Sequence, residues 1–166
     1  MKQALLWILL TSFVQAEAQI PRNASGSFEY THILTVDPSV LPSLDDKAKA
    51  FFRQPFLVHW DSVWTATQNS QLHITGRGYI DIRVNHGLSR TIFPVQLQFE
   101  MVTNDNSYHY TIHQLVANRK NSSYQFPLEE KPPGVKAVVY DQLLEKTHRY
   151  MVRLIAYMKK EMGGEE

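Results

Sequence analysis

The sequence predicts an α+β fold: a curved, five-stranded antiparallel sheet with two helices on one face. Three observations lead to this prediction. Residues 71–84 alternate between apolar and polar side chains, the two-residue period of a strand with one buried face. Residues 93–101 and 107–116 repeat this alternation. Residues 136–162 carry apolar side chains at intervals of three and four, the period of an amphipathic helix.

The first strand and the first helix are predicted from the first part of the chain. Residues 28–36 alternate, and Asp37-Pro38 ends that strand. Ser43 is followed by an acidic residue three positions later, which resembles a capping box, so a helix should begin there. Pro55 cannot continue a helix and disfavours helical angles in the residue before it. The helix should therefore end near Arg53.

Four strands are expected next, over residues 58–67, 71–84, 93–101 and 107–116. If Asp105 and Asn106 form the tip of the last hairpin, Met101 faces Tyr110 and the apolar faces of the two strands coincide. The expected topology is β-α-β-β-β-β-α, with the strands in the spatial order 2-3-4-5-1. Residues 117–134 show no apolar period and are interpreted as a connecting loop.

Two glycines, Gly76 and Gly78, fall on the apolar face of the strand over residues 71–84. Glycine weakens a strand and often marks a place where another group approaches the backbone closely. We therefore expect a helix or an aromatic ring to lie on the sheet over these two positions.

The first 18 residues are typical of a secretory signal peptide. Lys2 precedes an uncharged stretch over residues 4–14, and Ala16 and Ala18 form a small-x-small cleavage pattern. Cleavage would leave Gln19 at the start of a single exported domain, residues 19–166. The apolar stretch is shorter than the roughly twenty residues that span a bilayer, so we expect no transmembrane helix in the mature chain.

Composition narrows the classes of function. The chain contains no Cys, which excludes thiol nucleophiles and cysteine metal sites and leaves the domain to rely on packing alone. Its formal net charge of +1 gives no field that would gather nucleic acid, so no nucleic-acid partner is expected. An exported domain without disulfides favours the periplasm or surroundings of a Gram-negative bacterium over the extracellular space of an animal.

Three segments resemble a known bacterial family: SLDDKAKAFF at residues 43–52, ITGRG at 74–78 and NDNSYHY at 104–110. The family is an exported domain of unknown function, found mostly in Bacteroidetes and assigned a fold like that of the TATA-binding protein. The similarity covers about residues 28–116, and the helix over 136–162 matches in position. The chain departs at Asn106 and Ser107, where the family usually has a Gly and a basic residue. The resemblance implies fold and export but supplies no catalytic residues, and it does not imply DNA binding.

Histidines do not predict a metal site. His109 and His113 share a strand face, but four residues on a strand span about 13 Å, too far for one ion to hold both. A site would need His73 or His32 from a neighbouring strand together with a carboxylate such as Glu100. We expect neither a metal nor a cofactor.

Trp60 and Trp64 are the candidate binding residues. In a regular strand they share a face opposite Val63, so if Val63 points into the core, both indoles point away from it. Exposed indoles at this spacing would suit a sugar ring, a peptide or a protein surface. The alternative is that a helix or a loop covers them.

The predicted function is non-catalytic binding or assembly in the bacterial cell envelope, through an exposed sheet edge or the two tryptophans. Its partner would be an envelope protein. An alternative is a carrier that holds a small apolar ligand in a cavity between the sheet and the C-terminal helix, which the two glycines would enlarge. A hydrolase of envelope polymers has the least support, since no Gly-x-Ser-x-Gly motif is present and Glu29, Asp81 and Glu100 lie on separate strands.

Overall fold

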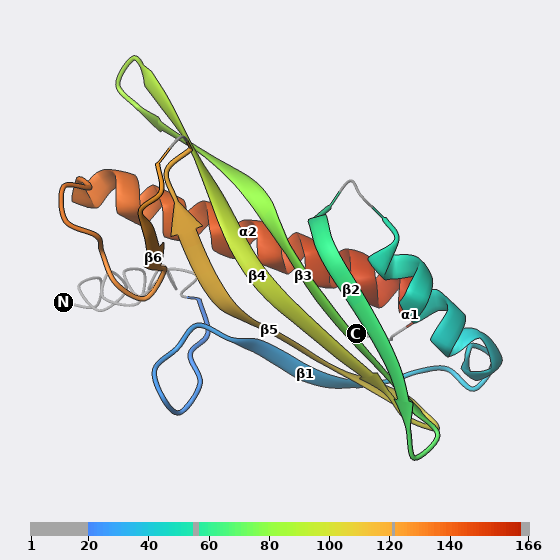
Figure 1. Ribbon diagram of the computed structural model, residues 1–166. Helices are drawn as coiled ribbons and strands as arrows, with labels where there is room; N and C mark the ends of the chain where they lie inside the picture. Colours follow the sequence, from blue (N-terminus) through green and yellow to red (C-terminus); the bar gives the residue numbers. More distant parts are fainter. Residues whose placement is uncertain (1–19, 55–56, 121, 164–166) are drawn as a thin grey trace, which may run out of the picture.

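The computed structural model describes residues 20–54, 57–120 and 122–163 (Figure 1). Its elements are β1 (Tyr30–Thr35), the 3-10 helix η1 (Leu41–Ser43), α1 (Leu44–Phe52), β2 (His59–Gln68), β3 (Gln71–His86), β4 (Ser89–Thr103), β5 (Ser107–Asn118), β6 (Gln125–Pro127) and α2 (Ala137–Met162). The predicted signal peptide, with its cleavage position at Ala18 and Gln19, lies outside the described residues.

The strands form one antiparallel sheet in the order β1-β5-β4-β3-β2, which is the predicted spatial order. The α+β class and the predicted sequence of helices and strands are confirmed. One strand was missed: β6 pairs with residues 116–118 of β5, within the region interpreted as a loop. A three-residue strand is too short to show a two-residue period in the sequence. Because β1 pairs with residues 107–112 of β5, β1 and β6 share one edge of that strand.

Both helices lie on the same face of the sheet, as predicted. In Figure 1, α2 crosses the strands on one side, and no helix of the described residues covers the other side. α2 packs against β3, and α1 packs against α2, β3 and β4. We call the helix side the covered face, marked by Ile74, Phe99 and Ile112, and the opposite side the open face, marked by Arg77 and Glu100. No helix among the described residues is long and apolar enough to cross a membrane.

The core fills the space between α2 and the sheet. Eight side chains of α2 are buried there: Val139, Tyr140, Leu143, Thr147, Met151, Leu154, Met158 and Met162. Three and four residues separate most of them, so they form one stripe along the helix. The helix ends at Gly163, whose φ of 70° is a left-handed conformation that favours glycine.

The hairpins follow the predicted registers. Met101 faces Tyr110, as expected for a tip at Asp105 and Asn106. Between β2 and β3, Asn69 and Ser70 adopt φ angles of 51° and 65° and form a two-residue turn. These turns place the apolar side chains of β3, β4 and β5 on the covered face.

The predicted capping box is wrong. The Ser43 hydroxyl donates a hydrogen bond to the carbonyl oxygen of Val40 at 3.0 Å, because Ser43 ends η1 and turns back onto that 3-10 turn. It makes no side-chain cap on α1. Asp45 in the first turn instead accepts a hydrogen bond from the Thr103 hydroxyl at 2.7 Å, which ties α1 to the end of β4. The helix ends at Phe52, as the proline predicted.

The expectation for the two glycines is confirmed at one position and corrected at the other. A Cβ on Gly76 would lie 2.7 Å from carbon atoms of both Phe52 and Trp60, so aromatic rings occupy that space. A Cβ on Gly78 would lie 2.5 Å from the carbonyl oxygen of His59. The main chain entering β2, rather than a helix or a ring, therefore passes over Gly78.

Candidate functional site

The two tryptophans of β2 do not share a face, so that prediction is wrong. Trp60 lies opposite Gly78, whereas Trp64 lies opposite Thr75. The register shifts between Trp60 and Ser62, where Asp61 is the extra residue of a β-bulge. One extra residue moves the chain after it to the other face. The sequence pattern assumed an unbroken strand and could not show this shift.

Trp60 is partly buried and packs against the core. Its ring centroid lies 5.0 Å from that of Phe52 and 6.3 Å from that of Phe99. Helix α1 supplies Phe52 and strand β4 supplies Phe99, so the indole is held between two elements of the covered face. Trp60 is therefore placed for packing, and it is withdrawn as a binding candidate.

Trp64 remains exposed, with 51% of its surface accessible, and it lies on the open face. The guanidinium carbon of Arg77 stands 5.5 Å from the centre of its ring. This geometry is a cation–π contact between neighbouring strands. Val63 lies on the covered side opposite Gly76 and is 39% exposed, so its side chain and that of Trp64 point to opposite faces.

A row of polar side chains continues from Arg77 across the open face. Arg77 Nε donates to Gln98 Oε1 at 3.0 Å, and Gln98 Nε2 donates to Glu100 Oε1 at 2.6 Å. His113 Nε2 lies 3.3 Å from the same Glu100 oxygen. Each group holds the next in place, from β3 across β4 to β5. The row fixes Arg77 above Trp64.

The histidines considered for a metal are not brought together with further ligands. His113 does lie beside Glu100. His109 is instead 2.9 Å from the Thr31 hydroxyl. Within the described residues, no three His, Asp or Glu side chains are placed to hold a metal ion.

Within the part of the chain that the structure describes, no strand lies along the outer edge of β2. We call residues Ser62–Gln68 the edge segment. Within it, residues 63–68 are exposed on both faces, and the whole segment contains no charged residue and no Pro. Exposed, uncharged edges are templates for pairing with another strand. The predicted strand order already placed this strand at an edge of the sheet, but the exposure of its residues depends on contacts with distant segments, which a local pattern does not show.

A groove of about 510 Å³ lies between α1 and the edge segment. Its lining residues are Lys49, Phe52, Arg53, Val63, Thr65 and Ile74. Phe52 and Ile74 are buried and form an apolar floor, while Lys49 and Arg53 supply two positive charges from the helix. We call this depression the α1/β2 groove.

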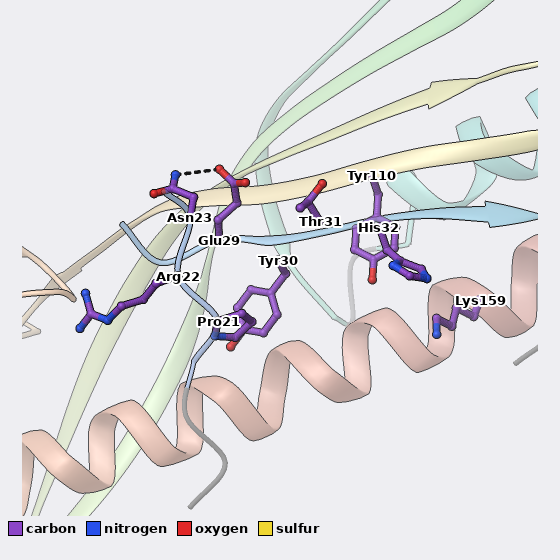
Figure 2. Close-up of a pocket in the computed structure, with 9 residues that line it drawn as sticks. All are labelled: Pro21, Arg22, Asn23, Glu29, Tyr30, Thr31, His32, Tyr110 and Lys159. Atoms are coloured by element: carbon purple, nitrogen blue, oxygen red, sulfur yellow. Dashed lines mark hydrogen bonds between the residues drawn. The ribbon is translucent and has the colours of Figure 1, made fainter. Parts of the chain in front are cut away.

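A second depression, of about 390 Å³, lies beside β1 at the opposite edge of the sheet (Figure 2). The segment before β1, β1 itself, β5 and α2 contribute its lining. Two of its polar groups are engaged: Asn23 donates a hydrogen bond to Glu29 at 3.0 Å (Figure 2). The guanidinium carbon of Arg22 lies 4.2 Å from the centre of the Phe28 ring.

Comparisons with solved structures identify the architecture. A DUF4468 family protein from Bacteroides ovatus is similar with a TM-score of 0.62 and 9% identity, over 87% of this chain and 90% of that one. A TBP-like protein from Parabacteroides distasonis is similar with a TM-score of 0.56 and 12% identity, over 86% of this chain and 96% of that one. The fold is TATA-binding-protein-like. At these identities the likeness shows the fold alone, and it confirms the fold that the resemblance in the sequence implied.

No protein-family model and no curated protein matches the sequence. Neither structural neighbour is named for a ligand or a reaction. A TATA-binding-protein-like fold does not carry a function with it, because function resides in particular sites. Function must therefore be inferred from the residues of this chain.

Proposed function

We propose that the protein is an exported, non-catalytic binding domain of the bacterial cell envelope, whose protein partner docks along the edge strand β2. The observation that carries this proposal is the edge segment, Ser62–Gln68, which is uncharged, mostly exposed and without a strand on its outer side among the described residues, and which includes the exposed indole of Trp64. The leader pattern ending at Ala18 and Gln19 supports export.

The other edge of the sheet gives a useful contrast. There the two short strands β1 and β6 pair with β5, so this edge of the sheet consists of short strands. Short edge strands and charged edge residues are common devices against unwanted pairing. In β2 the bulge at Asp61 protects one end, but the seven residues of the edge segment after it carry no such device. An edge left open in this way is best explained by a partner that uses it.

The carrier alternative loses its main support. It relied on Gly76 and Gly78 enlarging a cavity between the sheet and α2. Phe52 and Trp60 fill the space over Gly76, and the main chain of His59 crosses Gly78. The glycines therefore accommodate protein groups and give no reason to expect an apolar ligand.

Site-specific photo-crosslinking in the cells that naturally produce the protein tests the proposal. A photoreactive amino acid replaces Trp64 in one variant and Val138 in a control, because Val138 is also exposed, at 56%, but lies on α2. We expect a discrete crosslinked protein in the exported fraction from position 64 and none from position 138. The intact mass of the exported chain should correspond to a start at Gln19.

Four results would contradict the proposal. Equal crosslinking from positions 64 and 138 would remove the assignment to β2. The absence of a crosslink from position 64 would contradict a protein partner at β2. Retention of residues 1–18 in the exported fraction would contradict cleavage of a signal peptide. Recovery of the protein only inside the cell would contradict export.

A further inference from the structure

We infer that the α1/β2 groove binds an extended segment of a partner protein by strand addition, and that this segment carries apolar and acidic side chains. The inference rests on the proposed function, because it names the chemistry of the partner that docks on β2. Its basis is the juxtaposition of three features: free backbone groups, an apolar floor and two positive charges.

The backbone groups come from the hairpin geometry. In a two-residue turn, the flanking pair, here Gln68 and Gln71, is hydrogen-bonded, and bonded pairs alternate along an antiparallel ladder. The N–H and C=O groups of Val63, Thr65 and Thr67 therefore point away from β3. The described residues place no strand beside them. An added strand would satisfy these groups with main-chain hydrogen bonds.

The floor selects the side chains. Val63 and Thr65 pair with Gly76 and Ile74, so their side chains are on the covered face, where they line the groove together with Phe52. Every second side chain of an added strand would point to the same face. Apolar side chains at those positions would bury surface against Phe52 and Ile74, which provides affinity in addition to the backbone bonds.

The helix selects the charge. Lys49 and Arg53 stand at the groove, and neither forms an ion pair within the described residues. Arg77 lies on the other face of the same edge, above Trp64. An acidic segment would therefore meet positive charge on both faces of β2, which favours its encounter and its register.

A second copy of this chain fits the edge less well. The edge segment contains no acidic residue that could form an ion pair with Lys49 or Arg53 of another copy. Antiparallel pairing of two β2 strands would also bring the positive charges of both copies to one interface, and like charges at an interface oppose binding. We therefore assign the groove to a different protein.

Selection from a phage-displayed library of random linear peptides against the exported domain, residues 19–166, tests the inference. We expect enrichment of peptides in which apolar residues alternate with others and in which Asp and Glu outnumber Lys and Arg. Amide hydrogen exchange of the domain with a selected synthetic peptide should then show slowed exchange at Val63, Thr65 and Thr67.

Two matched pairs of variants locate the binding. Thr65→Pro removes an outward N–H that β3 does not use, and Thr65→Val keeps that N–H while it removes the hydroxyl. We expect Thr65→Pro to weaken peptide binding about tenfold, and Thr65→Val to leave it within about twofold. Arg53→Glu should weaken binding about tenfold, whereas Arg153→Glu, the same change at an exposed position of α2, should not.

Each alternative outcome overturns the inference. Enrichment of basic peptides, or unchanged binding by Arg53→Glu, would contradict the acidic partner. Binding without slowed exchange at the three amides would contradict strand addition, and this measurement needs no variant to fold. Dimerisation in solution that protects the same amides would assign the edge to a second copy. If a crosslink from position 64 persists while selected peptides bind elsewhere, the proposed function stands and this inference alone fails.

Discussion

The two tryptophans of β2 are four residues apart and have opposite surroundings. Trp60 packs between Phe52 and Phe99, whereas Trp64 is half exposed on the open face. A single extra residue, Asp61, separates these outcomes by shifting the strand's register. The comparison shows that a β-bulge can decide which of two similar residues stabilises the fold and which is free to bind.

The same division runs along the whole strand. Before the bulge, Trp60 packs against Phe52 and contributes to the core, whereas residues 63–68 after the bulge are exposed. The first part is tied to the fold, and the second projects as an edge with one neighbouring strand. The proposals on β2 depend on this difference, so the first prediction tests it directly.

Replacing each tryptophan by alanine should produce the largest contrast. We expect Trp60→Ala to lower the free energy of unfolding by about 3 kcal/mol, because it removes packing against two aromatic rings. Trp64→Ala should change the free energy by no more than about 0.5 kcal/mol, because it loses one exposed cation–π contact. Chemical denaturation of both variants measures these values. Similar losses from the two variants would mean that both indoles are in the core and that the bulge does not separate them.

Substitutions of Gly76 and Gly78 on the neighbouring strand β3 test the same difference between the two parts of β2. Gly76→Val and Gly78→Val should each destabilise the protein by about 1–3 kcal/mol, since a Cβ at either position meets atoms closer than 3.0 Å. Gly78→Val should cost more, because the obstacle there is main chain rather than ring atoms. Ala66→Val adds the same branched bulk in the exposed half of β2 and should change stability by no more than about 0.5 kcal/mol.

Denaturation midpoints of these three variants decide this prediction. An unchanged midpoint for Gly76→Val would show that Phe52 and Trp60 do not press on β3. A large loss from Ala66→Val would show that the edge segment is packed against something, which would weaken the case for a free edge.

Much of the fold was predictable because its strands are long and their alternation is regular. The two-residue period in β3, β4 and β5, together with polar turns, determined both register and strand order. The stripe on α2 was equally clear, and its bounds, Ala137–Met162, lie within one residue of the predicted range. In a long segment, one irregular position changes the overall hydrophobic period little, whereas in a short segment it can hide the period.

The candidate site was predicted only in part, because it depends on a local irregularity and on contacts between distant segments. Nothing in His59 to Trp64 signals a bulge, since Asp61 would also fit the polar side of a regular strand. The partners of Trp60 come from α1 and β4, and the groove needs α1 to lie beside β2. The sequence pointed to this strand and to both tryptophans as candidates, but it could not separate the exposed Trp64 from Trp60.

The smallest expected effect concerns a histidine on the covered face. His148 on α2 lies with Nδ1 2.9 Å from the Tyr30 hydroxyl, and the two rings stack with centroids 5.8 Å apart. Burial lowers the pKa of His148 below its usual value and raises the pKa of the Tyr30 hydroxyl. The covered face therefore disfavours charge here, near β1, at the edge of the sheet opposite to β2 and Trp60.

Linkage gives the direction of the pH dependence. The unfolded chain, with an ordinary His pKa of about 6.5, binds a proton more readily than the folded protein. The stability associated with a neutral His148 is therefore present above about pH 6.5, decreases as the pH falls below that value, and stops decreasing below the folded pKa. His148→Gln should flatten this part of the dependence. Tyr30→Phe should retain it, because burial rather than the hydrogen bond lowers the pKa. Denaturation midpoints between about pH 5 and pH 7.5 measure the effect, and an equal slope in His148→Gln and the natural protein would show that water reaches this ring.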